Sequence, residues 1–361
     1  MLGALTSRWT VFVPLLAAIT LAATWGRSLP AIGVDVVVAA LVGAVLAAVH
    51  HAEVIAHRVG EPLGALVLAV AVTVIEVGLI VTIMVSSGEK SATLARDTVF
   101  AAVMITCNGI FGLALLVGAV RRRVAVFNAE GTGAALGTVA TLATLSLVLP
   151  TFTTSKPGPE FSRAQLVFAA VASLLLYALF VMVQTVRHRD DFLPVEESDG
   201  VSAERGERPT VRATLLSLIM LVVALVGVVG LAKVVSPSIE STVASAGLPQ
   251  SAVGVVIALL VLLPETLAAV RAARRDQVQI SLNLALGSAM ASIGLTIPAI
   301  AVATIWLDGP LVLGLGATQM VLLALTVVVG VLTVVPGRAT LLQGGVHVAL
   351  FSAFVFLAAS P

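Results

Sequence analysis

Two glutamates stand apart from the other acidic residues of this chain. The sequence has 361 residues and 19 acids, and only Glu76 and Glu265 lie deep inside long apolar runs. A charge at the centre of a bilayer costs about 2.5–3.5 kcal/mol on insertion scales. Two such costs, at corresponding positions of two similar segments, indicate that the carboxyl groups have a function.

A buried pair of carboxylates suits the exchange of a cation for protons. Two carboxylates balance the charge of one Ca²⁺, which prefers oxygen ligands. Burial favours the neutral form of a carboxyl group, whereas a bound cation favours the anion. Protons and a cation therefore compete for the same oxygens, and this competition couples their movements. The alternative is structural: two protonated glutamates that join helices by hydrogen bonds.

Neutral oxygen atoms near the two glutamates could complete such a site. Thr73 precedes Glu76 by about one helical turn, and the next apolar run contains Asn108. In the second half, Ser288 and Ser292 are four residues apart and share one helix face. We expect these residues to add ligands, although small polar residues in membrane helices also serve helix packing. No cofactor is expected, because Ca²⁺ would be the cargo.

A proline directly before the second glutamate predicts a broken helix. Pro264 cannot donate a backbone hydrogen bond, so it frees a carbonyl about one turn earlier. A broken helix at the membrane midplane is tolerated where it lines a cavity, and its carbonyls can bind a cation. A simple kink is the alternative.

The elements that carry these residues are transmembrane helices. Of all residues, 59% are hydrophobic and 11% are charged, against about 45–50% and about 25% in soluble domains. This composition excludes most soluble folds and argues against nucleic-acid partners. A spanning helix needs about 20 apolar residues, so we predict an all-α polytopic protein with about eleven helices, near 10–26, 30–49, 62–86, 98–120, 131–150, 163–186, 211–235, 249–271, 279–305, 309–335 and 339–359.

The positive charges predict the orientation in the cell (inner) membrane. Most of the 20 lysine and arginine residues fall on the side of the N-terminus when the breaks between helices are assigned alternately to the two sides. Such residues are enriched in cytoplasmic loops. We therefore expect a cytoplasmic N-terminus, a cytoplasmic hydrophilic linker at 187–212, and a C-terminus outside.

The helices divide into one plus five plus five. We expect an N-terminal extra helix in 1–29, a first repeat at 30–186, a flexible linker at 187–212 and a second repeat at 213–361. Each repeat has its glutamate in its second helix. Because five is odd, the second copy must cross the membrane in the opposite sense, as in transporters with inverted-topology repeats.

A histidine-containing helix face and a single cysteine give weaker indications of function. His50, Glu53 and His57 share one helix face, which could be a metal site, a pH sensor or simply a polar helix end near the interface. An intramembrane metalloenzyme that uses these residues is an unfavoured alternative, and a passive channel is another. Cys107 is the single cysteine, so a disulfide framework is excluded.

The two glutamate motifs resemble the calcium/cation antiporter superfamily, and specifically its bacterial calcium/proton exchanger branch. The matching stretches include 60–64, 73–77, 96–100, 108–109, 262–265, 279–284 and 286–289. The resemblance extends over both repeats.

This resemblance implies a transporter rather than an enzyme, with a one-plus-five-plus-five fold that exports calcium while protons flow inward. It implies that Glu76 and Glu265 bind the cation and that Asn108 and Ser288 supply helper oxygens. The motif at 287–291 lacks a glutamine that many calcium/proton exchangers have at its last position. Sodium or potassium exchange therefore stays open as an alternative, as does the formation of a homo-oligomer.

Overall fold

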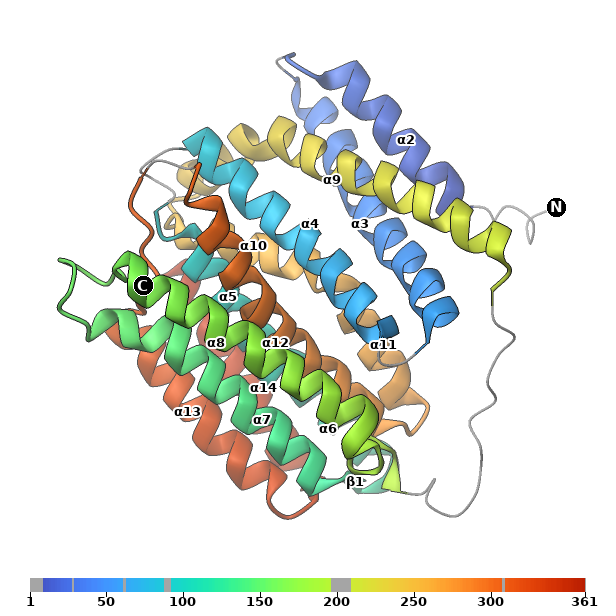
Figure 1. The fold of residues 1–361 in the computed structure, drawn as a ribbon, viewed down its shortest axis with the longest axis vertical. Helices are drawn as coiled ribbons and strands as arrows, with labels where there is room; N and C mark the ends of the chain where they lie inside the picture. The colour runs from blue at the N-terminus through green and yellow to red at the C-terminus, as the bar shows by residue number, and fades with distance from the viewer. Residues whose placement is uncertain are drawn as a thin grey trace.

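The computed structural model describes residues 9–27, 29–60, 63–87, 92–195, 209–306 and 309–360. Over these residues the chain is a bundle of helices (Figure 1). Nine helical spans in the described part are long and apolar enough to cross a membrane, and a bent pair supplies a tenth. A shorter apolar helix, α2 (Trp9–Thr24), corresponds to the first predicted run. The predicted all-α polytopic fold is confirmed.

The first half contains several helices that change their winding partway. Its elements are α3 (Ala31–Val59), α4 (Leu63–Ser87), α5 (Leu94–Met104), the π-helix η2 (Ile105–Ile110), α6 (Phe111–Arg122), α7 (Ala129–Ala143), η3 (Thr144–Val148), η4 (Leu149–Thr151), α8 (Arg163–Met182), η5 (Val183–Arg187) and η6 (Arg189–Phe192).

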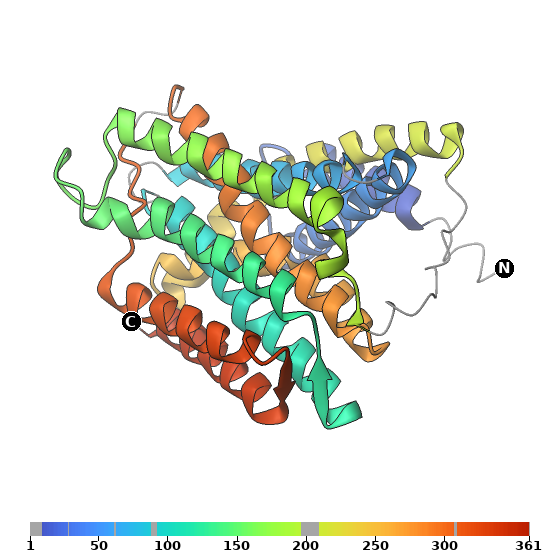
Figure 2. The same cartoon turned by 60° about the horizontal axis from the view of Figure 1, so that its bottom comes forward.

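The second half begins with a long helix and includes a broken one. Its elements are α9 (Val211–Ser245), α10 (Ser251–Val261), α11 (Leu263–Arg274), α12 (Val278–Ala303), α13 (Ala317–Val334) and α14 (Leu341–Ala359). Between α10 and α11 the chain bends by 53°. Figure 2 shows where the short strands β1 (Val124–Val126) and β2 (Arg338–Thr340) pair antiparallel beside the turn between α13 and α14.

Some helix ends differ from the sequence prediction. Helix α3 continues to Val59, well beyond the predicted end at 49, and α9 continues to Ser245 rather than 235. The predicted ends were placed where the apolar runs stop. A helix can continue through polar turns when it packs against another helix, and α3 and α9 pack along each other. Helix α13 starts at Ala317 instead of 309, because residues 309–316 run without helical structure.

The segment predicted as a flexible linker starts with ordered turns. Helices η5 and η6 continue from α8 as far as Phe192, whose ring packs edge-on against Phe180 at 5.8 Å between centroids. The side-chain amide of Asn283 donates to the Phe192 carbonyl at 2.7 Å. The prediction for residues 196–208 lies outside the described residues, and α9 already begins at Val211.

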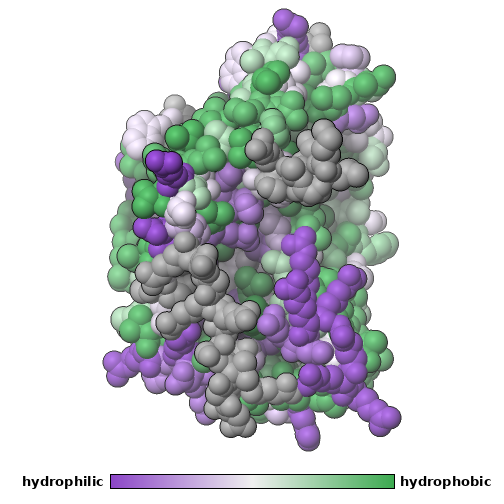
Figure 3. Space-filling view, turned by 90° about the vertical axis from the view of Figure 1, so that its right-hand side faces the viewer, coloured by the Kyte–Doolittle hydropathy of each residue, from purple (hydrophilic) through white to green (hydrophobic). Residues whose placement is uncertain are grey.

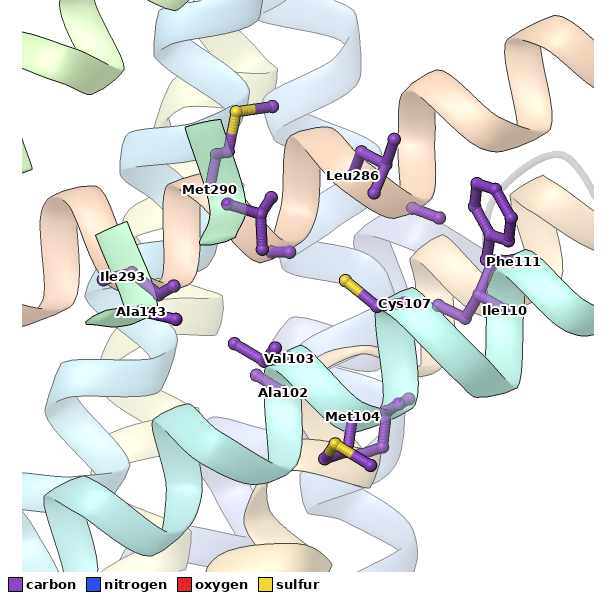
Figure 4. Close-up of a cluster of buried hydrophobic side chains, with 14 of the residues drawn as sticks. Ala102, Val103, Met104, Cys107, Ile110, Phe111, Ala143, Leu286, Met290 and Ile293 are labelled. Carbon is purple, nitrogen blue, oxygen red and sulfur yellow. The ribbon is translucent and has the colours of Figure 1, made fainter. Parts of the chain in front are cut away.

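The described helices pack into two groups, each with its own cluster of buried apolar side chains. One contains α2, α3 and α9, which pack along one another (Figure 1). The other is built around η2 and α12, where Val103, Cys107, Leu286 and Met290 are among the buried side chains (Figure 4). Helix α4 contacts both groups. Helices α4 and α10–α11 run in opposite directions (Figure 1).

Candidate cation-binding site

A cavity of about 400 Å³ lies among the helices that carry the two glutamates. It is lined by residues of α4, α5, α8, η5, η6, α10, α11 and α12. Arg189 of η6, which belongs to the 187–212 segment, is exposed and lines the cavity at its mouth. Figure 3 views the molecule from this end, where the surface is hollowed near the centre. The cavity therefore connects the interior with the face on which Arg189 lies.

Glu76 is held by two hydroxyl groups from the opposite half of the chain. Its side chain is 3% exposed, in the middle of α4. Ser292 donates a hydrogen bond of 2.6 Å to Oε1, and Thr296, one turn further along α12, donates one of 3.0 Å to Oε2. Hydrogen bonds to a charged acceptor are stronger than neutral ones. Both oxygens of Glu76 therefore have donors that stabilise the carboxylate.

Glu265 differs in that one of its oxygens has no donor. It lies in the first turn of α11, directly after the bend at Leu262. Within the described residues, its buried Oε2 atom has no hydrogen-bond partner. Buried polar atoms are rarely left unsatisfied, so this oxygen fits a ligand supplied from the cavity. A cation or a proton would satisfy it.

The break before Glu265 has the cause that the sequence indicated. Pro264 occupies the first turn of α11. Because proline has no N–H group, the carbonyl of Leu260 loses its helical donor. The 53° bend then separates the two helix segments. The predicted broken helix is confirmed, and it lines the cavity through Val261 and Leu262.

The structure brings most of the predicted site residues together. Glu76, Glu265, Thr73, Ser288 and Ser292 all line the cavity. Both carboxyl groups therefore belong to one site. The first half of the chain supplies Glu76, and the second half supplies Glu265. Helix α12, in the second half, supplies the two hydroxyl groups that bind Glu76.

Asn108 is placed elsewhere, and Thr296 was missed. Asn108 is fully buried, but its amide donates to Thr326 at 2.9 Å and its oxygen faces His347 Nδ1 at 3.1 Å. It does not line the cavity. It belongs to the π-helical turn η2, whose wider winding changes the direction of the side chains in a way that residue spacing does not reveal. Thr296 follows Ser292 by four residues, which is the signal that could have found it.

The histidine-containing face of α3 forms no metal centre in the part of the chain that the structure describes, where no three His, Cys, Asp or Glu residues are grouped to hold an ion. The neighbouring His51 is buried and its Nε2 atom lies 2.9 Å from the carbonyl of Thr10. This bond joins α3 to α2, so the residue has a packing role.

The model of the sodium/calcium exchanger protein family matches residues 29–186 and 216–359, most of the chain. The chain belongs to this family. It is 33% identical over 352 residues to the sodium-potassium/proton antiporter ChaA of Escherichia coli, covering 96% of this chain and 94% of that protein.

Further similarities agree with this membership. The chain is 46% identical over 356 residues to y4hA of Sinorhizobium fredii, described as an ionic transporter, covering 98% of this chain and 96% of the relative. Among solved structures, an H⁺/Ca²⁺ exchanger CAX has the same fold, with a TM-score of 0.70, 16% identity, and coverage of 97% of this chain and 86% of that one. The protein is therefore a multi-pass membrane transporter of cations, and not an enzyme.

Proposed function

We propose that this protein exchanges Ca²⁺ for protons across the bacterial inner membrane and exports calcium. One observation carries the proposal: Glu76 and Glu265, from opposite halves of the chain, line one cavity, and a buried oxygen of Glu265 has no hydrogen-bond partner within the described residues. Two facing carboxylates repel each other unless a cation or protons lie between them. The pair therefore suits alternate loading with a divalent cation and with protons.

The two glutamates contribute differently to this cycle. The hydroxyl groups of Ser292 and Thr296 stabilise the anionic form of Glu76 before a cation arrives. Within the described residues, the Oε2 atom of Glu265 has no hydrogen-bond donor, so it can bind a ligand without first losing a hydrogen bond. Thr73 and Ser288 line the same cavity and supply further oxygens that a hard cation such as Ca²⁺ could use.

Alternating access between inverted repeats is the proposed mode of transport. The antiparallel directions of α4 and α10–α11, and the match of the family model to two separate segments, support a division into two repeats of opposite sense. The cavity opens towards the 187–212 segment. The arginines at the ends of α6 and α11 support a cytoplasmic location of this face.

Exchange of Na⁺ or K⁺ for protons is the second candidate function. It is favoured by the relative that is named a sodium-potassium/proton antiporter. The same two carboxylates would serve, because a monovalent cation also competes with protons for them. The two functions differ in the cation whose transport is coupled to the movement of protons.

Everted membrane vesicles test the proposal. After an acid interior is imposed, addition of Ca²⁺ should make the lumen more alkaline, and Glu76→Gln or Glu265→Gln should abolish this signal. Glu130→Gln serves as the control, because Glu130 is an exposed residue at the start of α7. Full exchange in either glutamine variant of the cavity would refute the mechanism. A response to Na⁺ or K⁺ but not to Ca²⁺ would establish the second candidate.

A further inference from the structure

Helices α5 and α10 make a close contact near their N-terminal ends, at the end of the bundle away from β1 (Figure 1). Helix α10 packs along α5, and Gly254 of α10 lies against the backbone at Asp97. A Cβ atom at position 254 would lie 2.9 Å from both the Asp97 carbonyl carbon and the Thr98 nitrogen. Because these are backbone atoms, a larger residue could not fit without moving one helix away from the other.

A buried ion pair holds the α5 side of this contact. Asp97 is 4% exposed, and its Oδ1 atom lies 2.8 Å from Nη2 of Arg96. Thr93 donates a hydrogen bond of 2.8 Å to Oδ2, and Gln319 at the start of α13 donates one of 3.4 Å to Oδ1. Asp97 lies in the first turn of α5, and these bonds connect that turn to α13.

Arg96 extends the same network to the segment before α13. Its Nη1 atom donates a hydrogen bond of 3.2 Å to the carbonyl of Gly314. In the same segment, the Val312 N–H donates to the Ala92 carbonyl at 3.0 Å. The start of α5 is thus fixed to residues 309–316 and to α13, which gives α10 a rigid surface to pack against.

The contact between α10 and α5 lies beside the cavity. Ala258, Val261 and Leu262 line the cavity from α10 and the bend that follows it, while Ala102 lines it from α5. The two helices that meet at Gly254 and Asp97 therefore also border the cavity. If the halves are inverted repeats, α4 corresponds to α10–α11 and α12 corresponds to α5. Helices α4 and α12 also line the cavity, and the inverted counterpart of this pair is α10 with α5.

We propose that Arg96, Asp97 and Gly254 form an outer seal, and that separation of Gly254 from Asp97 opens the cation site to the face opposite the linker. This inference rests on the proposed exchange function, because it assigns positioning residues to the step in which the site changes sides. The ion pair favours the state that is open to the linker face. Weakening the pair shifts the population towards the state that is open on the other face.

Cysteine labelling from one side of the membrane tests the seal. Thr98 is fully buried beside Gly254, and its hydroxyl has no hydrogen-bond partner among the residues described. Thr98→Cys is therefore a conservative reporter, in a Cys107→Ser background that removes the native thiol. Intact cells are treated with a membrane-impermeant maleimide, and the labelling rate of residue 98 is measured.

The reporter should react slowly alone and faster when the seal is weakened. We expect Asp97→Asn, which keeps the side-chain shape, and Gly254→Ala each to raise the rate by about tenfold, the effect of 1.4 kcal/mol on the equilibrium between the two states. Glu160→Gln is the matched control, because Glu160 pairs with the exposed Lys156 on a loop at the same end. Its rate should equal that of the reporter alone.

Two results would overturn the proposal. One is an unchanged labelling rate in both variants while their thermal unfolding in detergent stays cooperative. The other is a higher rate only in inverted vesicles, which would place the contact on the linker side of the barrier. Labelling requires no movement of cations, so a failure of the seal is distinguishable from a failure of exchange in the vesicle assay.

Discussion

The two hydroxyl groups that hold Glu76 offer a quantitative test of the site. Ser292 and Thr296 donate to different oxygens of the same carboxylate, at 2.6 and 3.0 Å. We predict that Ser292→Ala and Thr296→Val each weaken the competition of the cation against protons. Both changes remove a donor that stabilises the anion more than the protonated acid, and Thr296→Val preserves the side-chain shape.

The magnitude follows from the strength of such bonds. A hydrogen bond to a charged group contributes about 1.5 kcal/mol or more, and about 1.4 kcal/mol corresponds to a factor of ten in an equilibrium constant. Each substitution should therefore raise the cation concentration for half-maximal exchange by about tenfold at fixed pH. Ser292→Ala should have the larger effect, because its bond is shorter.

The assay is cation-induced alkalinisation of everted vesicles, titrated with Ca²⁺ at constant pH. Thr304→Ala provides the control, because Thr304 directly follows α12 and its hydroxyl bonds only to the nearby Ala301 carbonyl. The half-saturating concentration should not change in this variant. If both test variants also leave it unchanged while their thermal stability is normal, the hydroxyl groups do not tune Glu76, and the reasoning is refuted.

Two further predictions concern the helix break and the buried amide. Pro264→Ala restores a donor for the Leu260 carbonyl; it should raise the unfolding temperature and reduce the exchange rate, and unchanged exchange would show that the break is not needed. Asn108→Ala removes the bonds that its side chain makes to Thr326 Oγ1 and His347 Nδ1 in a fully buried position, while each of the two keeps its other partner. It should lower stability by about 1–3 kcal/mol, measured by unfolding in detergent, while the half-saturating cation concentration stays the same. A changed concentration would place Asn108 in the cation site after all.

The sequence alone determined the features that depend on composition and local chemistry. Long apolar runs have one stable form in lipid, the helix, because every backbone polar group must be satisfied internally. The helix count, the isolation of Glu76 and Glu265 among apolar residues, and the break at Pro264 therefore followed from residue types and spacing. The family was recognisable from the same motifs.

Only the tertiary structure decided which side chains meet. Thr296 joined Glu76 although the two are 220 residues apart, because α12 crosses α4 at that depth. Asn108 faced α13 and α14 instead of the cavity, since a π-helical turn changes direction without a signature in residue spacing. Arg96 and Asp97 have no feature in the sequence that predicts their burial. Contacts with α10, α13 and the 309–316 segment are what bury them, and such contacts depend on the packing of distant segments.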